Sequence, residues 1–433
     1  MTANGAGRVA AAPAPAPAAS AVGAPLLIAL GLLSMLGPFS TDAFLPALPT
    51  MAEELHVGNG QVQLSLTGVT LGMALGQLLA GPLSDGIGRR TPLLIGSTAM
   101  TLAAVGAAFS PSLPVLVVCC AAMGLGASFG MVIGRAVVSD LADGPAMTRA
   151  FALMGTLIGL GPVLSPIFGV AVMWLWGWRA IFVGLGLLAA LGLALVAALV
   201  PESLPADRRL EHAFRALPRN ALTALRSRTY LGGATVIWFG FATQFAYIAA
   251  SAFLVQSLLG LSPLVYAITF GVNGVGLIGA GLLAARLARS WSDRALMALG
   301  LGVQAAGAAV VLVTVLTGTV SAATLLPALF LIACSMGVVF GPATSFALQG
   351  LRHVSGTALA VIGSVQFLGA GLVSPLVEIG GDQDPMPFAV VVSIGVALAF
   401  TGWAIFTRPS LTHRPLAHHT GASIPEGDIH ETT

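Results

Sequence analysis

The sequence predicts an all-α membrane protein with twelve transmembrane helices in two six-helix bundles. Of its 433 residues, 57% are hydrophobic and only 8% are charged, whereas a soluble domain carries roughly a quarter charged residues. Uncharged apolar runs recur along the chain, each about 20 residues long, the length that crosses a bilayer as a helix. Strands of a transmembrane β-barrel are excluded, because they would be about 10 residues long and would alternate in polarity.

Twelve apolar runs have this length. They fall near 25–47, 61–83, 92–110, 114–138, 147–172, 178–200, 230–256, 264–285, 295–317, 322–346, 356–378 and 386–407. The widest gap, 201–229, is basic and interrupted by prolines, and it separates six runs from six. We therefore expect a first bundle over 24–200, a central cytoplasmic loop over 201–229 and a second bundle over 230–407. Two such bundles are typical of transporters that bind substrate between their halves near the bilayer midplane.

The arginines predict the orientation of the chain, which has no lysine. The connections on one side hold Arg89, Arg90, Arg149, Arg208, Arg209, Arg215, Arg219, Arg226, Arg228, Arg286, Arg289, Arg294 and Arg352. The connections on the other side hold only Arg179. Since basic residues concentrate on the cytoplasmic side, both termini are expected to be cytoplasmic, in a multi-pass protein of a bacterial plasma membrane.

The two ends of the chain carry little information about function. Residues 1–23 are rich in alanine and proline and are expected to be a disordered cytoplasmic tail. The tail over 408–433 contains four histidines, His413, His418, His419 and His430, but their spacing does not favour zinc. We expect no metal and no cofactor. The three cysteines lie inside predicted helices, as buried thiols.

Residues 81–96, GPLSDGIGRRTPLLIG, concentrate charge between the second and third apolar runs. Gly81 and Gly88 lack a Cβ, so we expect the helix end and the turn to approach a neighbour closely there. Arg89 and Arg90 anchor the turn at the inner interface. Asp85 needs a positive partner at the bilayer edge, either an arginine or the N-terminus of a facing helix.

This stretch resembles the loop signature of the major facilitator superfamily, GxLaDrxGrkxxL. Gly86 stands where the family has a basic residue after the aspartate. The resemblance implies a latch that holds the cytoplasmic ends of the two halves together in the outward-facing state. Arg135, in the fourth run, is a hypothetical additional partner of this latch.

The fifth run reads GTLIGLGPVLSPIFGV and resembles the helix-5 signature of drug:proton antiporters in that superfamily, GxxxGPxxGG. Phe168 and Gly169 stand where two glycines are usual. The residues of this motif are Gly155, Gly159, Gly161, Pro162, Pro166 and Gly169. Sugar symporters generally lack the motif, so the resemblance favours export.

Asp42 is the one acidic residue within the first apolar run. An intramembrane carboxylate is unfavourable and predicts a function. Because burial disfavours the charged form, Asp42 is expected to exchange a proton or to pair with a cationic drug. The alternative is a solvated residue near the outer surface that only orients the helix.

Three further stretches narrow the resemblance: TDAFLPALP in the first run, GWRAIF at 177–182, and the FAYI and GLSP elements of 245–278. They resemble the Bcr/CflA branch of bacterial exporters associated with bicyclomycin, chloramphenicol and sulfonamides. In that branch the fourth helix begins RxxQGxGxA, and here Cys120 and Met123 replace the arginine and the glutamine. The resemblance links that arginine to proton coupling, so Asp42 has no predicted buried cationic partner.

The expected substrate cavity is apolar and aromatic with a few polar groups. Its candidate residues are Phe44, Gln77, Trp238, Phe241, Gln244, Tyr247, Ser251, Asn273, Gln366 and Phe367. The sequence therefore predicts proton-driven efflux of a small lipophilic drug by a monomer in the lipid bilayer, with no nucleic-acid partner. The alternatives are a metabolite-uptake symporter and a non-transporting receptor or scaffold on the same fold. An enzyme is not expected, since paired carboxylates, a metal-ligand set and a nucleophile–base pair are all missing from the sequence pattern.

Overall fold

The computed structural model describes residues 23–210, 213–351, 354–381 and 384–407. The N-terminal stretch through residue 22, Arg352 and the histidine-containing tail lie outside the described residues. In the described part, helices and connecting loops make up the structure, with no strand among them, and 12 helices are long and apolar enough to cross a membrane. The all-helical, twelve-span prediction is confirmed.

The first half contains six spans and three short helical elements. Its elements are α1 (Ala24–Asp42), η1 (Leu45–Ala47), α2 (Leu48–Glu54), α3 (Asn59–Val62), α4 (Leu64–Ile87), α5 (Arg90–Ala108), α6 (Leu113–Leu141), α7 (Gly144–Trp176) and α8 (Trp178–Leu199). The central connection holds a short 3-10 turn, η2 (Ala206–Arg208), and the amphipathic helix α9 (Ala213–Leu225).

The second half repeats the six-span pattern. Its elements are α10 (Arg228–Phe253), the π-helical turn η3 (Leu254–Leu258), α11 (Pro263–Leu287), α12 (Asp293–Leu316), α13 (Ala322–Ala347), α14 (Ser355–Val373), η5 (Ser374–Glu378) and α15 (Met386–Phe406). Prolines lie inside several spans without ending them, as Pro82 does in α4 and Pro342 in α13. Membrane helices tolerate such prolines when neighbouring groups satisfy the freed backbone.

Two predicted segments differ from the structure in detail. The span predicted near 25–47 is present within Ala24–Glu54, but α1 ends at Asp42 and a 3-10 turn follows. The turn predicted within 81–96 is shorter than that stretch. Helix α4 continues through Pro82 to Ile87 and α5 begins at Arg90, so Gly88 and Arg89 alone connect the two helices.

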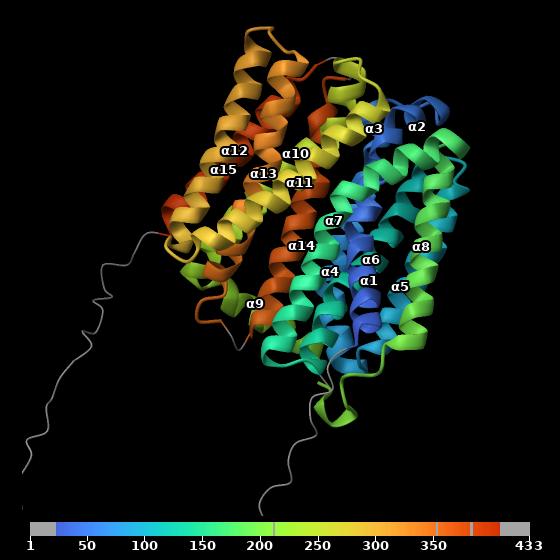
Figure 1. Ribbon diagram of the computed structural model, residues 1–433, viewed down its shortest axis with the longest axis vertical. Coiled ribbons are helices and arrows are strands. Elements are labelled where there is room, and N and C mark those ends of the chain that lie inside the picture. Colours follow the sequence, from blue (N-terminus) through green and yellow to red (C-terminus); the bar gives the residue numbers. More distant parts are fainter. Residues whose placement is uncertain (1–22, 211–212, 352–353, 382–383, 408–433) are drawn as a thin grey trace, which may run out of the picture.

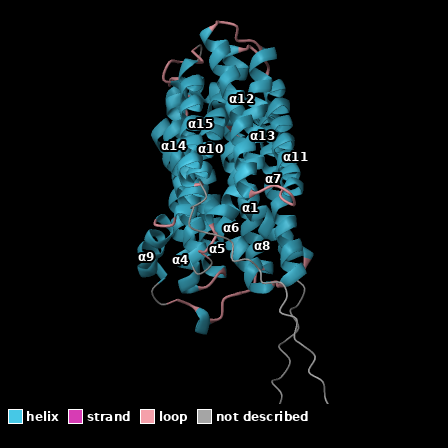
Figure 2. Cartoon of the chain, turned by 90° about the vertical axis from the view of Figure 1, so that its left-hand side faces the viewer, coloured by secondary structure: helices cyan, strands magenta, loops and turns pink. Residues whose placement is uncertain are grey.

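The two halves lie side by side (Figure 1), with the first half in blue to green and the second in yellow to red. They meet along two helix pairs, α4 with α14 and α7 with α11. Figure 2 shows that the helices run in roughly one common direction, with loops at the two ends. We call the end that carries α2 and α3 the Gln63 end, and the end that carries α9 the Arg89 end.

Candidate functional site

Asp42 is the last residue of α1, and only 4% of its surface is exposed. The hydroxyl of Thr41, the preceding residue, donates a hydrogen bond to its Oδ1 at 2.8 Å. Within the described residues no ion pair reaches Asp42, so the carboxylate is buried without a cationic partner. The proposal that it is a solvated, orienting residue does not agree with this burial.

The second half contributes a polar cluster around Asp42. Tyr247 on α10 and Tyr266 on α11 lie close enough for the charge of Asp42 to act on their hydroxyls. The Asn273 amide donates to the Tyr247 hydroxyl at 2.8 Å, and Ser251 and Tyr266 share a hydrogen bond of 3.2 Å. Asp42 therefore lies near the junction of the two halves, within electrostatic reach of two tyrosine hydroxyls of the second half.

Helix α7 packs closely on α1 through part of its predicted motif. A Cβ added at Gly161 would lie 2.9 Å from the Pro38 side chain, and one added at Gly169 would overlap the Ala43 carbonyl oxygen. Pro162 and Pro166 lie inside the helix between these contacts. The motif therefore brings α7 against the end of α1 that holds Asp42.

The other two motif glycines differ from each other. Gly159 faces the second half, because a Cβ there would lie 3.4 Å from Ile278 on α11. A Cβ at Gly155 would meet open space. Gly155 is therefore not needed for a close helix contact in this structure.

The structure brings some of the predicted cavity residues together and separates one of them. The Phe241 and Phe367 rings contact each other across α10 and α14 with centroids 5.6 Å apart, and the Trp238 indole donates to the Ile362 carbonyl at 3.2 Å. Phe44 instead packs inside the first half against Phe182, at 5.4 Å between ring centroids. We therefore remove Phe44 from the candidate cavity.

Among the predicted polar residues of the cavity, Gln77 lies at the junction between the halves. Gln77 on α4 reaches α14, where a Cβ at Gly363 would lie 3.0 Å from its Oε1. Gln244 and Gln366 are 8% and 6% exposed, on α10 and α14. Cys120 and Met123 are fully buried on α6, so no charge replaces the missing arginine there.

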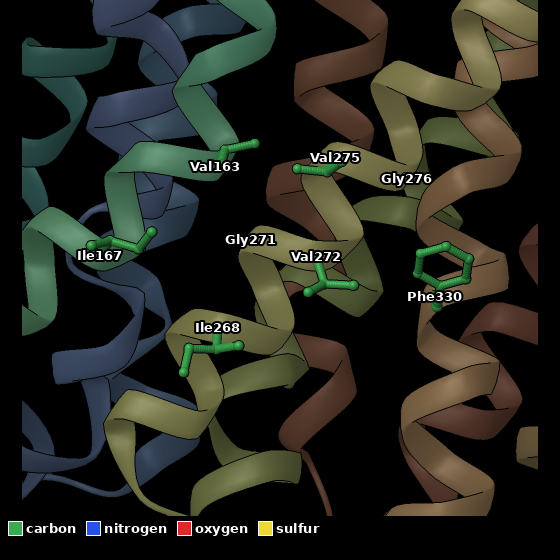
Figure 3. Close-up of a pocket in the computed structure, with 8 residues that line it drawn as sticks. All are labelled: Val163, Ile167, Ile268, Gly271, Val272, Val275, Gly276 and Phe330. Atoms are coloured by element: carbon green, nitrogen blue, oxygen red, sulfur yellow. The ribbon is translucent and has the colours of Figure 1, made fainter.

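A separate apolar groove of about 480 Å³ lies between α7, α11 and α13 (Figure 3). Its lining residues are Val163, Ile167, Ile268, Gly271, Val272, Val275, Gly276 and Phe330. The groove contains none of the predicted cavity residues. It follows the α7–α11 junction, where several of its side chains are exposed on the face expected to contact lipid.

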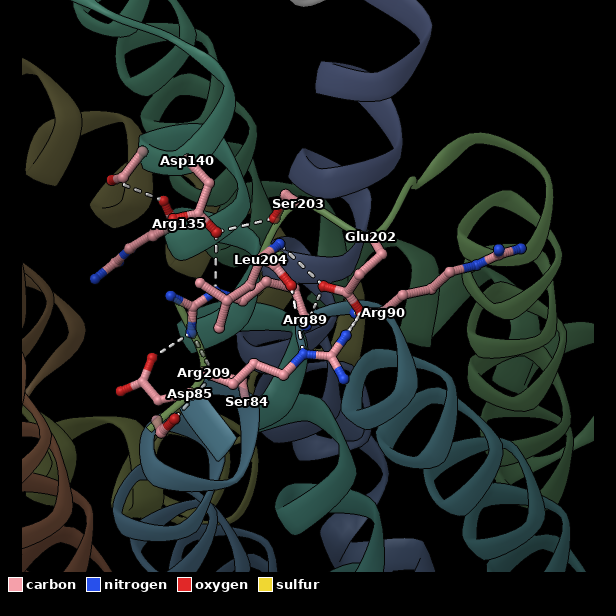
Figure 4. Close-up of polar contacts among 12 residues, drawn as sticks. Ser84, Asp85, Arg89, Arg90, Arg135, Asp140, Glu202, Ser203, Leu204 and Arg209 are labelled. Carbon is pink, nitrogen blue, oxygen red and sulfur yellow. Dashed lines mark hydrogen bonds and ion pairs between the residues drawn. The ribbon is translucent and has the colours of Figure 1, made fainter. Parts of the chain in front are cut away.

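Arg89 is the centre of a charged cluster at its end of the molecule (Figure 4). Its guanidinium pairs with Asp85, with Asp140 at 2.9 Å, and with the Ser84 hydroxyl at 2.8 Å. Burial lowers the pKa of Arg89, but the hydrogen bonds and charges of Asp140 and Asp85 outweigh this effect and raise it above its usual value. Arg89 therefore stays charged and holds the ends of α4 and α6 together.

Glu202, in the central connection, extends this cluster. Its carboxylate accepts hydrogen bonds from the backbone N–H of Arg89 at 2.7 Å and of Arg90 at 3.3 Å. Gly88 has a φ of +98°, and a Cβ there would collide with Glu202, so the turn requires glycine. The expectation of a close approach at Gly81 is wrong, because nothing lies within 4 Å of a Cβ added there.

The predicted latch has a different arrangement in this structure. Asp85 pairs with Arg89 of the same half, and the Asp85 carbonyl accepts from Leu210 of the central connection at 2.9 Å. Among the described residues no ion pair joins Arg135 to Asp85, and Figure 4 shows its guanidinium pointing away from the cluster. The hypothetical Arg135 pairing is therefore absent in this conformation.

Sequence reasoning missed Gln63, which is fully buried between the halves. Its amide nitrogen donates to the Ala249 carbonyl at 3.0 Å, and its amide oxygen accepts from Ser374 at 2.9 Å. Thr67 adds a bond to the Gly371 carbonyl at 3.1 Å. The available signal was a glutamine inside an apolar run, since a buried amide needs partners.

The comparisons with known proteins agree with this fold. Residues 30–374 match the family model of the Major Facilitator Superfamily. An uncharacterized MFS-type transporter, YdgK of Bacillus subtilis, is 31% identical over 87% of this chain and 94% of its own length. A bicyclomycin resistance protein homolog of Haemophilus influenzae is 26% identical over 90% of this chain and 97% of its own length.

A solved structure supports the fold independently. The crystal structure of a D-xylose-proton symporter superposes with a TM-score of 0.68, at 19% identity, over 88% of this chain and 97% of that one. The resemblance to drug:proton antiporters predicted from the loop and helix-5 motifs is confirmed by the relatives. The chain is a multi-pass membrane transporter and belongs to the major facilitator superfamily.

Proposed function

We propose that the protein exports small lipophilic drugs across a bacterial plasma membrane in exchange for protons, by alternating access between its two halves. The observation that carries this proposal is Asp42, a buried carboxylate without a cationic partner at the junction of the halves. A carboxylate in such a place is unfavourable when ionised. It is therefore suited to bind and release one proton as its surroundings open and close.

The orientation of the proposed cycle follows from charge. Of the described arginines, all except Arg179 lie at or toward the Arg89 end, where the positive-inside rule places the cytoplasm. Arg179 pairs with Glu54 at 2.7 Å at the opposite end. In this orientation, both termini are cytoplasmic and the bonds of Gln63 close the outer end.

Protonation of Asp42 couples to this closure. When the outer end is open, a proton from outside neutralises the carboxylate and removes the penalty of burying it, which allows the outer end to close. When the cavity opens to the cytoplasm, the proton leaves and the drug enters. A drug that cannot bind while Asp42 is neutral then travels only in the direction opposite to the proton.

The chemistry of the junction favours a lipophilic substrate. The rings of Phe241, Phe367 and Trp238 supply apolar surface, and the amides of Gln77 and Gln244 supply orienting hydrogen bonds. The bicyclomycin resistance protein homolog among the relatives supports a drug as cargo. The α7 motif against α1 supports export over uptake.

Everted membrane vesicles with an acidic interior test this function. Addition of chloramphenicol, bicyclomycin or tetraphenylphosphonium is expected to release protons, reported by a pH-sensitive dye. Asp42→Asn should abolish the release while membrane insertion is unchanged. Glu53→Gln is the matched control, because Glu53 is an exposed carboxylate at the same end. Drug-induced release that persists in Asp42→Asn contradicts the assignment of Asp42.

A further inference from the structure

We propose that Ser165 on α7 is a positioning residue for Asp42, whose hydroxyl donates a hydrogen bond to the carboxylate once it loses its proton. This inference rests on the proposed role of Asp42 in proton exchange. It concerns the group that stabilises the ionised form, in a protein without a buried cation beside that carboxylate.

Four residues of α1 form a stripe that faces α7. Gly31, Met35, Pro38 and Asp42 are spaced by four, three and four residues, which puts them on one side of an α-helix. A Cβ at Gly31 would overlap Leu157 of α7, and Met35 and Pro38 both lie against Gly161. Asp42 is the next position of this stripe.

Ser165 lies on α7 level with the last turn of α1. Gly161, Ser165 and Gly169 are four residues apart and share one face of α7. Gly161 touches the stripe at Pro38, and Gly169 touches the backbone of Ala43. Since both contacts run in the same direction along the two helices, Ser165 lies between them, at the turn of α1 that ends in Asp42.

The hydroxyl of Ser165 has a free donor. Ser165 is 0% exposed, and its Oγ has no hydrogen-bond partner among the described residues. Several other buried serines of the first half donate to a carbonyl one turn back, as Ser34 does to Leu30 at 2.9 Å. A buried hydroxyl without a partner is unfavourable, so a partner is expected in another state of the transport cycle.

The Asp42 carboxylate has oxygen lone pairs that can accept a hydrogen bond from the Ser165 hydroxyl. An ionised carboxylate accepts up to about four hydrogen bonds, and here Thr41 occupies Oδ1. The titratable groups within reach of its charge are the hydroxyls of Tyr247 and Tyr266.

The remaining titratable groups on the neighbouring helices are engaged or distant. Arg179 on α8 pairs with Glu54, and Asp140 on α6 belongs to the Arg89 cluster. Cys120 on α6 lies against Gly68 of α4, and Arg135 and Arg149 lie toward the Arg89 end of α6 and α7. None of these groups supplies a positive charge to Asp42, which makes neutral donors such as Ser165 the groups that stabilise its anion.

The sign of the expected effect follows from hydrogen bonding. A donor to the ionised carboxylate favours the charged form. Removing the donor makes Asp42 hold its proton to higher pH. The pH at which half of the protein has lost this proton should therefore rise in Ser165→Ala.

Infrared difference spectroscopy of the purified protein in lipid measures this midpoint without any drug. The band of the protonated carboxyl group is assigned by its disappearance in Asp42→Asn. We expect Ser165→Ala to raise the midpoint by about 1 to 2 pH units, the size expected for one hydrogen bond to a charged group. Ser165→Cys, which keeps the volume but donates weakly, should shift it in the same direction. Ser34→Ala is the matched control and should not shift it.

The outcomes separate this inference from the proposed function. An unchanged midpoint in Ser165→Ala, with a titrating band that depends on Asp42, overturns the role of Ser165 and leaves Asp42 in place. An equal shift in Ser34→Ala also overturns it, because the effect is then general to helix packing. If the wild-type protein has no titrating band that Asp42→Asn removes, the proposed proton exchange at Asp42 fails as well.

Discussion

The two ends of the molecule are held together in opposite ways. At the Gln63 end, neutral groups bond across the two halves: Gln63 bridges Ala249 and Ser374, and Thr67 reaches Gly371. At the Arg89 end, charged groups bond within the first half and its following connection. The contacts at the Gln63 end join the two halves to each other. The contacts at the Arg89 end fix the helices of the first half relative to one another.

This difference fits a transporter that moves its halves. A neutral hydrogen bond contributes about 0.5–1.5 kcal/mol net, and one to a charged group about 1.5–3 kcal/mol. Weak neutral bonds between the halves can break and re-form in each cycle. Strong charged bonds inside a half keep its helices fixed while the half moves. We therefore expect mutations at the Arg89 end to affect stability, and mutations at the Gln63 end to affect conformation.

Arg89→Gln should have the largest effect. Its side chain is 10% exposed and pairs with two carboxylates, and removal of one partner from a buried charge cluster destabilises by about 3–5 kcal/mol. Thermal unfolding in detergent should show a markedly lower Tm. Arg90→Gln is the control, because the Arg90 side chain is bonded to a single exposed carbonyl, that of Ala197. Equal losses in both variants would show that the cluster has no special role.

Gln63→Leu should shift conformation with little loss of insertion. It keeps the volume and removes both bonds that Gln63 makes across the halves, so the free-energy cost of opening the Gln63 end falls by about 1–3 kcal/mol. The measurement is labelling of a cysteine at buried Ala370 by a membrane-impermeant maleimide, with the three native cysteines replaced. We expect labelling to accelerate about tenfold or more.

Gln61→Leu provides the control for this experiment. Gln61 lies two residues away, is exposed, and its side chain bonds to the nearby Gly58 backbone at 3.0 Å. Unaccelerated labelling in Gln63→Leu, or the same acceleration in Gln61→Leu, contradicts a closure by Gln63.

Thr67→Val should produce a smaller version of the same change. It removes one bond of 3.1 Å to Gly371 and preserves the shape of the side chain. An effect of about 1 kcal/mol is expected, or about fivefold in the labelling rate. Because Thr67 lies one turn from Gln63 and its backbone N–H donates to the Gln63 carbonyl at 3.0 Å, the two effects are expected to be coupled rather than additive. Exact additivity in the double variant would mean that the two cross-half bonds break independently.

The sequence predicted the parts of this structure that depend on composition. Apolar run length located all twelve spans, because the thickness of the bilayer sets how many apolar residues a helix needs to cross it. The orientation indicated by the arginines stays a prediction. Asp42 was also predictable, since one carboxylate in an apolar run is conspicuous. The cross-half bonds of Gln63 were not predictable, because they depend on which carbonyl faces it from a helix far away in the chain.

The same reasoning explains the errors. The concentration of charge and glycine suggested a turn within 81–96, but α4 is helical to Ile87, and only Gly88 and Arg89 connect it to α5. Phe44 looked like a cavity residue because the 3-10 turn that rotates it toward Phe182 has no signal in the sequence. The sequence shows that Ser165 lies within the motif stretch of the fifth apolar run. Its proposed position beside Asp42 depends on how α1 and α7 pack against each other, which the sequence does not show.

Asp85→Asn should have the smallest effect, although Asp85 is the acidic residue of the loop signature. Its side chain is 39% exposed, and Arg89 keeps Asp140 and Ser84 when Asp85 is neutral. Exposed ion pairs contribute about 0–1 kcal/mol, so efflux should fall by at most about fivefold with insertion unchanged.

Asp140→Asn is the matched variant that decides what Asp85 does. Asp140 is only 20% exposed and also accepts from Ser203 at 2.9 Å, so its loss should destabilise the first half more than the loss of Asp85. If Asp85→Asn instead abolishes efflux at normal stability, Asp85 acts on the second half in another state. The Arg89 end would then also form contacts between the two halves, as the Gln63 end does. The difference between the two ends would hold only in the conformation described.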